Sequence, residues 1–92
     1  MTDMPEGDTA AVLAFVRERL AQGDASLRAG NARGAIVWYD SALAACARKG
    51  KVTELRETLR ALWQNKAIAH QQLREFVEAQ EAMLHAQRLS AP

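Results

Sequence analysis

The fold is decided by the stretch GNARGAIVWYDSAL, residues 30–43, in which a glycine is followed at once by a helical pattern. Its first two residues, Gly and Asn, tolerate the left-handed backbone that ends a helix. Ala35, Tyr39 and Ala42 then recur four and three residues apart, which is the spacing of one helix face. Alanine stands where leucine is usual, so we expect a second helix to approach this face closely.

The same kind of pattern covers most of the chain. It predicts four helices with short connections, over residues 9–29, 32–49, 54–72 and 76–89. Asp8 or Thr9 can cap the first helix and Thr53 the third, because their side-chain oxygens accept hydrogen bonds from free N–H groups. Strong helix formers dominate the composition, whereas Val, Ile and Thr are scarce. The sequence therefore predicts an all-α fold.

Length and charge set the limits of the domain. The chain has 92 residues, so we expect a flexible tail at residues 1–8 and one domain at 9–92. The net charge of +1 gives no strong field, but residues 48–66 carry six bases against two acids. We interpret this run as a solvated helix face. The alternative is a surface that binds RNA or another anionic surface electrostatically.

The compartment is predicted from one cysteine and from the hydropathy of the chain. Cys46 has no second cysteine to pair with, which suits a reducing compartment, and it is expected to be a buried thiol. No apolar run reaches the roughly 18 residues that span a membrane. The N-terminus has no secretory or transit signal, so we expect a cytoplasmic protein without membrane insertion.

The two halves of the chain repeat one another at a separation of 44 residues. The matching pairs are Gly23 and Ala67, Ala35 and Ala79, Tyr39 and Met83, and Ala42 and Ala86. With Trp63 at the tryptophan position of the second copy, these residues resemble the tetratricopeptide repeat, whose pattern places Trp, Gly, Tyr and Ala at such spacings. The copies span about residues 16–50 and 53–92. Their long separation is similar to that of immunophilin-type co-chaperones.

The first copy departs from the pattern at Arg19, Gln22 and Ser26, and the second at Lys66 and His70. The resemblance implies antiparallel helical hairpins, with four helices in a right-handed superhelical array. It also implies a non-catalytic protein–protein interaction module, a small adaptor, scaffold or subunit that binds another protein or a peptide. Such arrays bind peptides in the groove lined by the first helix of each repeat. The matching positions here are Arg17, Leu20, Asp24, Leu27, Gln64, Asn65, Ile68 and Gln71.

A chaperone-tail-binding co-chaperone is an alternative that the resemblance raises. Asn65 matches one residue of the clamp that holds a terminal carboxylate in that group, but Leu20 and Asp24 replace its lysine and its first asparagine. Because Asp24 would repel a carboxylate, we expect this binding to be weak or absent. An ordinary solvated groove is the other interpretation of these positions.

Three aromatic side chains need separate interpretations. Trp63 matches the tryptophan of the repeat and is expected in the core. Phe15 and Trp38 lie off the alanine stripe and either cover the long first helix or form outer-face anchors for a partner.

The sequence gives little support for chemistry. His70 and His85 are fifteen residues apart, and Glu81 one turn before His85 adds too few ligands for a metal site. Cys46 has no histidine nearby in the sequence that would make it a nucleophile. We therefore expect no catalytic residues, no metal and no cofactor, and a protein that is not an enzyme.

The last helix is expected to close the array. Ile36 and Leu43, which would face the next repeat, become Gln80 and Gln87 in the second copy. A polar outer face suits a terminal repeat, so we expect a complete small protein. Leu84 and Leu89 remain as apolar surface there, which a homodimer or a larger assembly would cover.

Overall fold

The computed structural model describes residues 8–50 and 53–90, and these form four α-helices without a strand. The helices are α1 Thr9–Arg28, α2 Ala32–Lys49, α3 Thr53–Gln72 and α4 Phe76–Ser90. The predicted all-α class is confirmed. Residues 1–7 of the predicted tail, the base Lys51 and the final two residues lie outside the described part of the chain.

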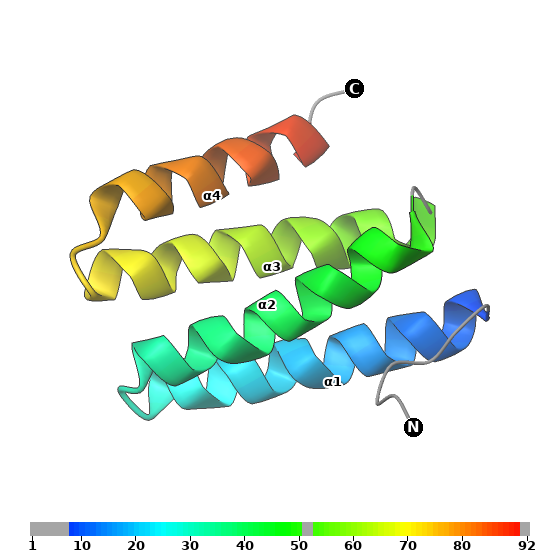
Figure 1. Cartoon of the computed structure of the whole chain (residues 1–92), viewed down its shortest axis with the longest axis horizontal. Coiled ribbons are helices and arrows are strands. Elements are labelled where there is room, and N and C mark those ends of the chain that lie inside the picture. The colour runs from blue at the N-terminus through cyan, green and yellow to red at the C-terminus, as the bar shows by residue number, and fades with distance from the viewer. Residues whose placement is uncertain (1–7, 51–52, 91–92) are drawn as a thin grey trace.

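The helices form two hairpins that lie against each other (Figure 1). α1 packs mainly on α2, and α3 packs mainly on α4. α2 contacts α3 along the junction between the hairpins, and α1 also contacts α3. No helix in the described ranges is both long and apolar enough to cross a bilayer.

The helix boundaries follow the predicted caps closely. Asp8 caps α1, since its Oδ1 accepts a hydrogen bond from the backbone N–H of Ala10 at 2.9 Å. Asn31 caps α2 in the same way, with its side chain accepting from Gly34 N at 2.9 Å. The expectation for Thr53 was wrong by one position, because α3 begins at Thr53 itself.

The turn between α1 and α2 ends the first helix with a left-handed residue. Gly30 has φ 83°, which costs a glycine little because it has no Cβ. Gly30 N donates to Leu27 O at 3.0 Å, and Asn31 N donates to Ser26 O at 2.9 Å. This pair of bonds is the Schellman motif, which satisfies carbonyl groups at a helix end.

The turn between α3 and α4 repeats this motif at the same separation of 44 residues. Arg74 N donates to Gln71 O at 3.0 Å, and Glu75 N donates to His70 O at 2.8 Å. Arg74 takes the left-handed position with φ 59°, in place of a glycine. The backbone therefore supports the internal repeat that the side chains predicted.

The core of each hairpin is built around small residues. Ala35, Ala42, Ala67, Ala79 and Ala86 are all buried, as the repeat predicted. The largest fully buried side chain is that of Tyr39 in the first hairpin, which has no exposed surface.

Gly23 lies directly against the ring of Tyr39. A Cβ added at Gly23 would lie 2.3 Å from Cε1 and 2.7 Å from Cδ1 of Tyr39. The glycine thus makes room for an aromatic ring, which explains why a large side chain fits an otherwise small-residue face.

Candidate functional site

The eight predicted groove residues are divided between α1 and α3. Arg17, Gln64, Ile68 and Gln71 are exposed, whereas Leu20 and Leu27 are half-buried and pack against the core. The remaining two residues, Asp24 and Asn65, are brought together by the contact of α1 with α3.

Asp24 and Asn65 belong to a polar bridge with Tyr39. Asn65 Nδ2 donates to Asp24 Oδ1 at 2.9 Å, and the Tyr39 hydroxyl donates to the same oxygen at 2.6 Å. Burial, and then the bond to Asp24, raise the pKa of Tyr39 well above its usual value. The bridge links α1, α2 and α3. It occupies the amide of Asn65, the group that the resemblance to co-chaperones would assign to a carboxylate ligand.

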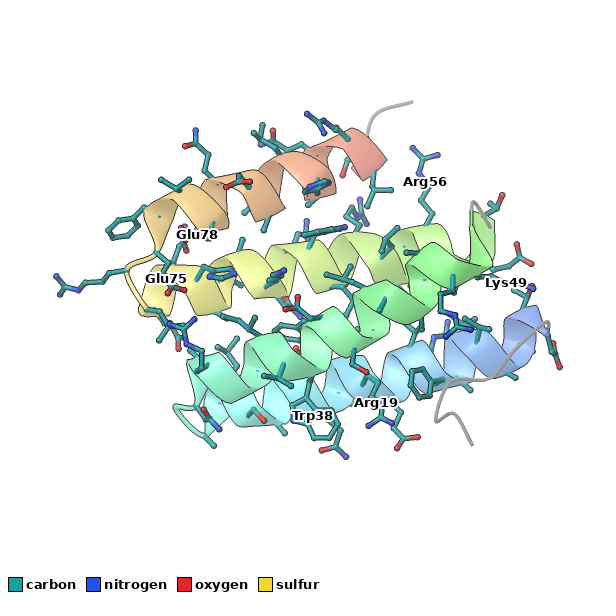
Figure 2. The ribbon with its side chains drawn as sticks, in the orientation of Figure 1. Arg19, Trp38, Lys49, Arg56, Glu75 and Glu78 are labelled. Carbon is teal, nitrogen blue, oxygen red and sulfur yellow. The ribbon has the colours of Figure 1, made fainter. Side chains whose placement is uncertain are left out.

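The predicted outer-face anchors, Phe15 and Trp38, meet at Arg19. The Arg19 guanidinium carbon is 4.6 Å from the Phe15 ring centroid and 5.3 Å from that of Trp38. Trp38 is half-buried over α1 at this point (Figure 2). Of the two interpretations of Trp38, its contacts favour the one in which it covers the first helix.

The basic run at residues 48–66 contacts other helices, while Arg48 and Arg56 remain exposed as the interpretation from sequence expected. Arg56 Nε donates to the Leu89 carbonyl at 2.8 Å, and Arg60 Nη1 donates to Ser90 Oγ at 3.5 Å. Both bases reach the C-terminal end of α4, where a helix attracts cations. Lys66 pairs with Asp40 of α2 at 2.6 Å.

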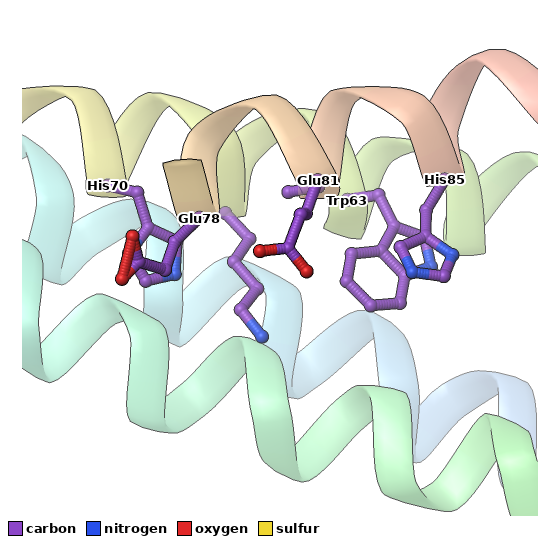
Figure 3. A pocket seen from close by; sticks show the side chains of 7 residues that line it. Trp63, His70, Glu78, Glu81 and His85 are labelled. Atoms are coloured by element: carbon purple, nitrogen blue, oxygen red, sulfur yellow. The ribbon is translucent and has the colours of Figure 1, made fainter. Parts of the chain in front are cut away.

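A crevice between α3 and α4 is the feature that the sequence did not predict. It has a volume of about 210 Å³. Figure 3 shows the side chains that line it, with Glu81 between Glu78 and the Trp63–His85 pair. The lining residues are Trp63, Lys66 and His70 from α3 and Glu78, Glu81, Ala82 and His85 from α4.

One wall of the crevice is an aromatic stack. The rings of Trp63 and His85 are 4.1 Å apart between centroids and 14° from parallel. The expectation that Trp63 lies in the core was therefore wrong, because Trp63 is half-buried and its ring stacks on the exposed His85. Lys66 Nζ lies 5.2 Å from the Trp63 centroid.

The end of the crevice near the turn is held by an ionic cluster. His70 Nδ1 is 2.8 Å from Glu75 Oε1, and Arg33 Nη2 of α2 is 2.7 Å from Glu75 Oε2. The bond from Arg33, followed by that from His70, lowers the pKa of Glu75, and Glu75 in turn raises the pKa of Arg33. Glu75 therefore links the two hairpins at their turns.

The first hairpin has a tryptophan where the crevice has an alanine. Trp38 and Ala82 are 44 residues apart, as are Arg19 and Trp63. Trp38 packs over Arg19, so in the first hairpin the indole lies against the residue that corresponds to Trp63. The sequence did contain a sign of the crevice, because the second copy has Ala82 at the position where the first copy has Trp38.

The remaining candidate groups are one thiol and the potential metal ligands. Cys46 is buried, and burial raises the pKa of its thiol to about 11, so little of the nucleophilic thiolate forms at neutral pH. Among residues 8–50 and 53–90, no three His, Cys, Asp or Glu side chains are grouped to hold a metal ion.

The outer face of α4 is partly apolar. Gln80 and Gln87 are exposed, in agreement with a polar terminal face. Phe76, Val77 and Leu84 are also exposed, by 65%, 69% and 45%. Only Leu84 was anticipated from the sequence, so this face is more apolar than expected.

A scan against protein-family models, a search of curated proteins and a search of solved structures each found no match.

Proposed function

We propose that the chain is a non-catalytic protein–protein interaction module of the tetratricopeptide type, acting as a small adaptor or a subunit of a larger assembly. In this proposal a segment of the partner binds to the second hairpin and places one side chain in the crevice between α3 and α4. The observation that carries the proposal is the open crevice at Ala82, where the equivalent Trp38 occupies the first hairpin. A cytoplasmic location is part of the proposal and rests on the single free cysteine.

The size of the crevice supports a protein partner. Pockets that enclose a small-molecule ligand usually measure about 300–1,000 Å³. The crevice, at about 210 Å³, is smaller and matches one inserted side chain. The exposed Phe76, Val77 and Leu84 on the same helix give a partner apolar surface to cover outside the crevice.

The alternatives have less support. For chaperone-tail binding, the amide of Asn65 would have to leave Asp24, and the Asp24 carboxylate would repel the ligand. For electrostatic binding of RNA, the basic run would have to present its charges outward, whereas Arg56, Arg60 and Lys66 contact other parts of the chain. Binding that falls steeply with salt would revive the second alternative.

The experiment is a selection of peptides from a display library against the folded chain, followed by affinity measurements on two variants. Ala82→Trp introduces into the crevice the side chain that Trp38 places in the first hairpin. Ala44→Trp makes the same change at an exposed alanine of α2 and serves as the matched control. We expect selected peptides to lose at least about tenfold in affinity, roughly 1.4 kcal/mol, for Ala82→Trp alone.

Unchanged affinity for Ala82→Trp would refute the proposal, provided that circular dichroism shows a folded variant. If Ala82→Trp does not fold, Glu81→Lys gives the same test at an exposed position on the rim.

A further inference from the structure

We infer that the side chain accepted by the crevice is basic, a lysine or an arginine of the partner segment. This inference rests on the proposed function and adds the chemical class of the ligand. It depends on three observations: carboxylates without an ion-pair partner, a flat wall for an aliphatic stem, and an arginine packed against aromatic rings in the first hairpin.

The carboxylates of Glu78 and Glu81 supply the charge. They lie one helical turn apart on the α4 side of the crevice (Figure 3). Within the described residues neither has an ion-pair partner, whereas Asp40 and Glu75 are paired with Lys66 and Arg33. The charge of Glu78 also acts on Arg33, but a cation entering here would meet two carboxylates with no cation in direct contact.

The cations already near the crevice do not cancel this charge. Lys66 contributes one positive charge, but Asp40 neutralises it at 2.6 Å. Arg33 is likewise bound to Glu75, at 2.7 and 3.3 Å. The four carboxylates therefore outnumber the two permanent cations by two, and the local field attracts a basic group.

The wall of the crevice suits the stem of a basic residue. Ala82 and the Trp63–His85 stack present apolar atoms, and lysine and arginine bury their methylene chains on such surfaces while the charged end stays near polar groups. A neutral aliphatic side chain would use the wall but leave both carboxylates without a partner. An acidic side chain would be repelled.

The first hairpin provides an internal precedent. There Arg19 lies between the rings of Phe15 and Trp38, with its guanidinium carbon within 4.6 and 5.3 Å of the two centroids. A basic side chain thus already packs against aromatic rings in this fold, an arrangement favoured by cation–π attraction. The second hairpin has the aromatic wall and adds the acids, since Gly34 and Val37 become Glu78 and Glu81.

The test uses five-residue peptides, blocked at both ends, with alanine around one central residue. The central residue is arginine, lysine, citrulline or glutamate. The Trp38→Phe variant leaves Trp63 as the sole tryptophan, so the indole N–H signal in a ¹⁵N–¹H spectrum reports on the crevice. We expect saturable shifts with the arginine and lysine peptides, and binding at least about tenfold weaker with citrulline, which has the shape of arginine without its charge.

The charge contribution is tested with Glu78→Gln/Glu81→Gln. The control is Glu54→Gln/Glu57→Gln, which neutralises two exposed acids at the same spacing in the first turns of α3. Only the first pair should weaken binding of the arginine peptide, by about tenfold or more. Equal binding of arginine and citrulline peptides, no shift with any basic peptide, or an unaltered affinity in Glu78→Gln/Glu81→Gln would overturn the inference.

The outcomes separate this inference from the proposed function. Selected peptides that lose affinity for Ala82→Trp but contain no basic residue would leave the proposed function intact and refute the inference. Binding of the arginine peptide at Trp63, together with selected peptides that ignore Ala82→Trp, would support the inference and refute the proposed function.

Discussion

Trp38 and Ala82 stand at the same position of their two hairpins, 44 residues apart, and they differ by an indole ring. In the first hairpin this ring packs over Arg19. In the second the missing ring leaves a crevice of about 210 Å³ beside Trp63. The two hairpins share their turns and their small-residue core, so we attribute the crevice of the second hairpin to this difference.

Removal of the Trp38 ring should destabilise the domain and open a second crevice. Trp38 is half-buried, so we expect Trp38→Ala to lower the free energy of unfolding by about 1–3 kcal/mol, less than for a fully buried tryptophan. Urea unfolding followed by circular dichroism measures this change. A loss below about 0.5 kcal/mol, typical of surface substitutions, would mean that the indole does not pack over α1.

Gly23 should not tolerate a methyl group. Its added Cβ would lie 2.3 Å from a ring atom of Tyr39, which is buried and tied to Asp24. We expect Gly23→Ala to destabilise the domain by about 1–3 kcal/mol, although alanine is the better helix former. The same change in a Tyr39→Leu background should have a smaller effect, as a double-mutant cycle would show. Equal effects in both backgrounds would rule out the ring as the cause.

Arg74 should be the easiest position at which to stabilise the protein. It has φ 59° in a turn whose counterpart uses Gly30 at φ 83°. A left-handed conformation disfavours side chains with a Cβ by about 1–2 kcal/mol, so Arg74→Gly should raise stability by about 1 kcal/mol. For a domain of this size, the melting temperature should rise by about 4–8 °C. Gly30→Ala should have the opposite effect, and an unchanged melting temperature in both variants would contradict the turn geometry.

The cluster around Glu75 should make stability depend on acid pH. Arg33 and His70 lower the pKa of Glu75, so the folded state holds the carboxylate ionised more firmly than the unfolded state does. The stabilisation is present above the ordinary glutamate pKa of about 4.3 and is lost as pH falls through the lower folded value. The difference in unfolding free energy between wild type and Glu75→Gln should thus shrink on going from pH 7 to pH 3. A difference that stays constant over this range would show that the ionised carboxylate is not the stabilising species.

Much of the fold could be predicted because local signals mark the ends of the helices. The ends of the first two helices were predicted to within one residue from three positions. Asp8 and Asn31 cap the helices, and Gly30 adopts the left-handed backbone that ends α1. The α3–α4 turn was predicted in its place despite its lack of glycine, because the apolar pattern of α4 restarts after it.

The contacts between helices could not be predicted in the same way. The resemblance to the repeat placed Asp24 and Asn65 in one groove but did not indicate that their side chains bond. The bases Arg56 and Arg60 resembled a solvated run because their acceptors, Leu89 O and Ser90 Oγ, lie on a helix distant in sequence.

The candidate site was missed for a related reason. A tryptophan at the repeat position suggested burial, but Trp63 has an imidazole on one side and the space left by a small alanine beside it. The repeat pattern shows which types of side chain are present at each position. It does not show the volume of the crevice beside Ala82, where the first copy has the indole ring of Trp38.

The most direct test of the proposed interaction at the second hairpin is a map of chemical-shift changes in the ¹⁵N–¹H spectrum during titration with a selected peptide. We expect saturable changes concentrated at the crevice, with the largest at Trp63, Ala82 and His85 and none along α1. Changes concentrated instead at Arg17, Gln64 and the neighbouring positions of the α1–α3 face, with the crevice signals unmoved, would contradict it.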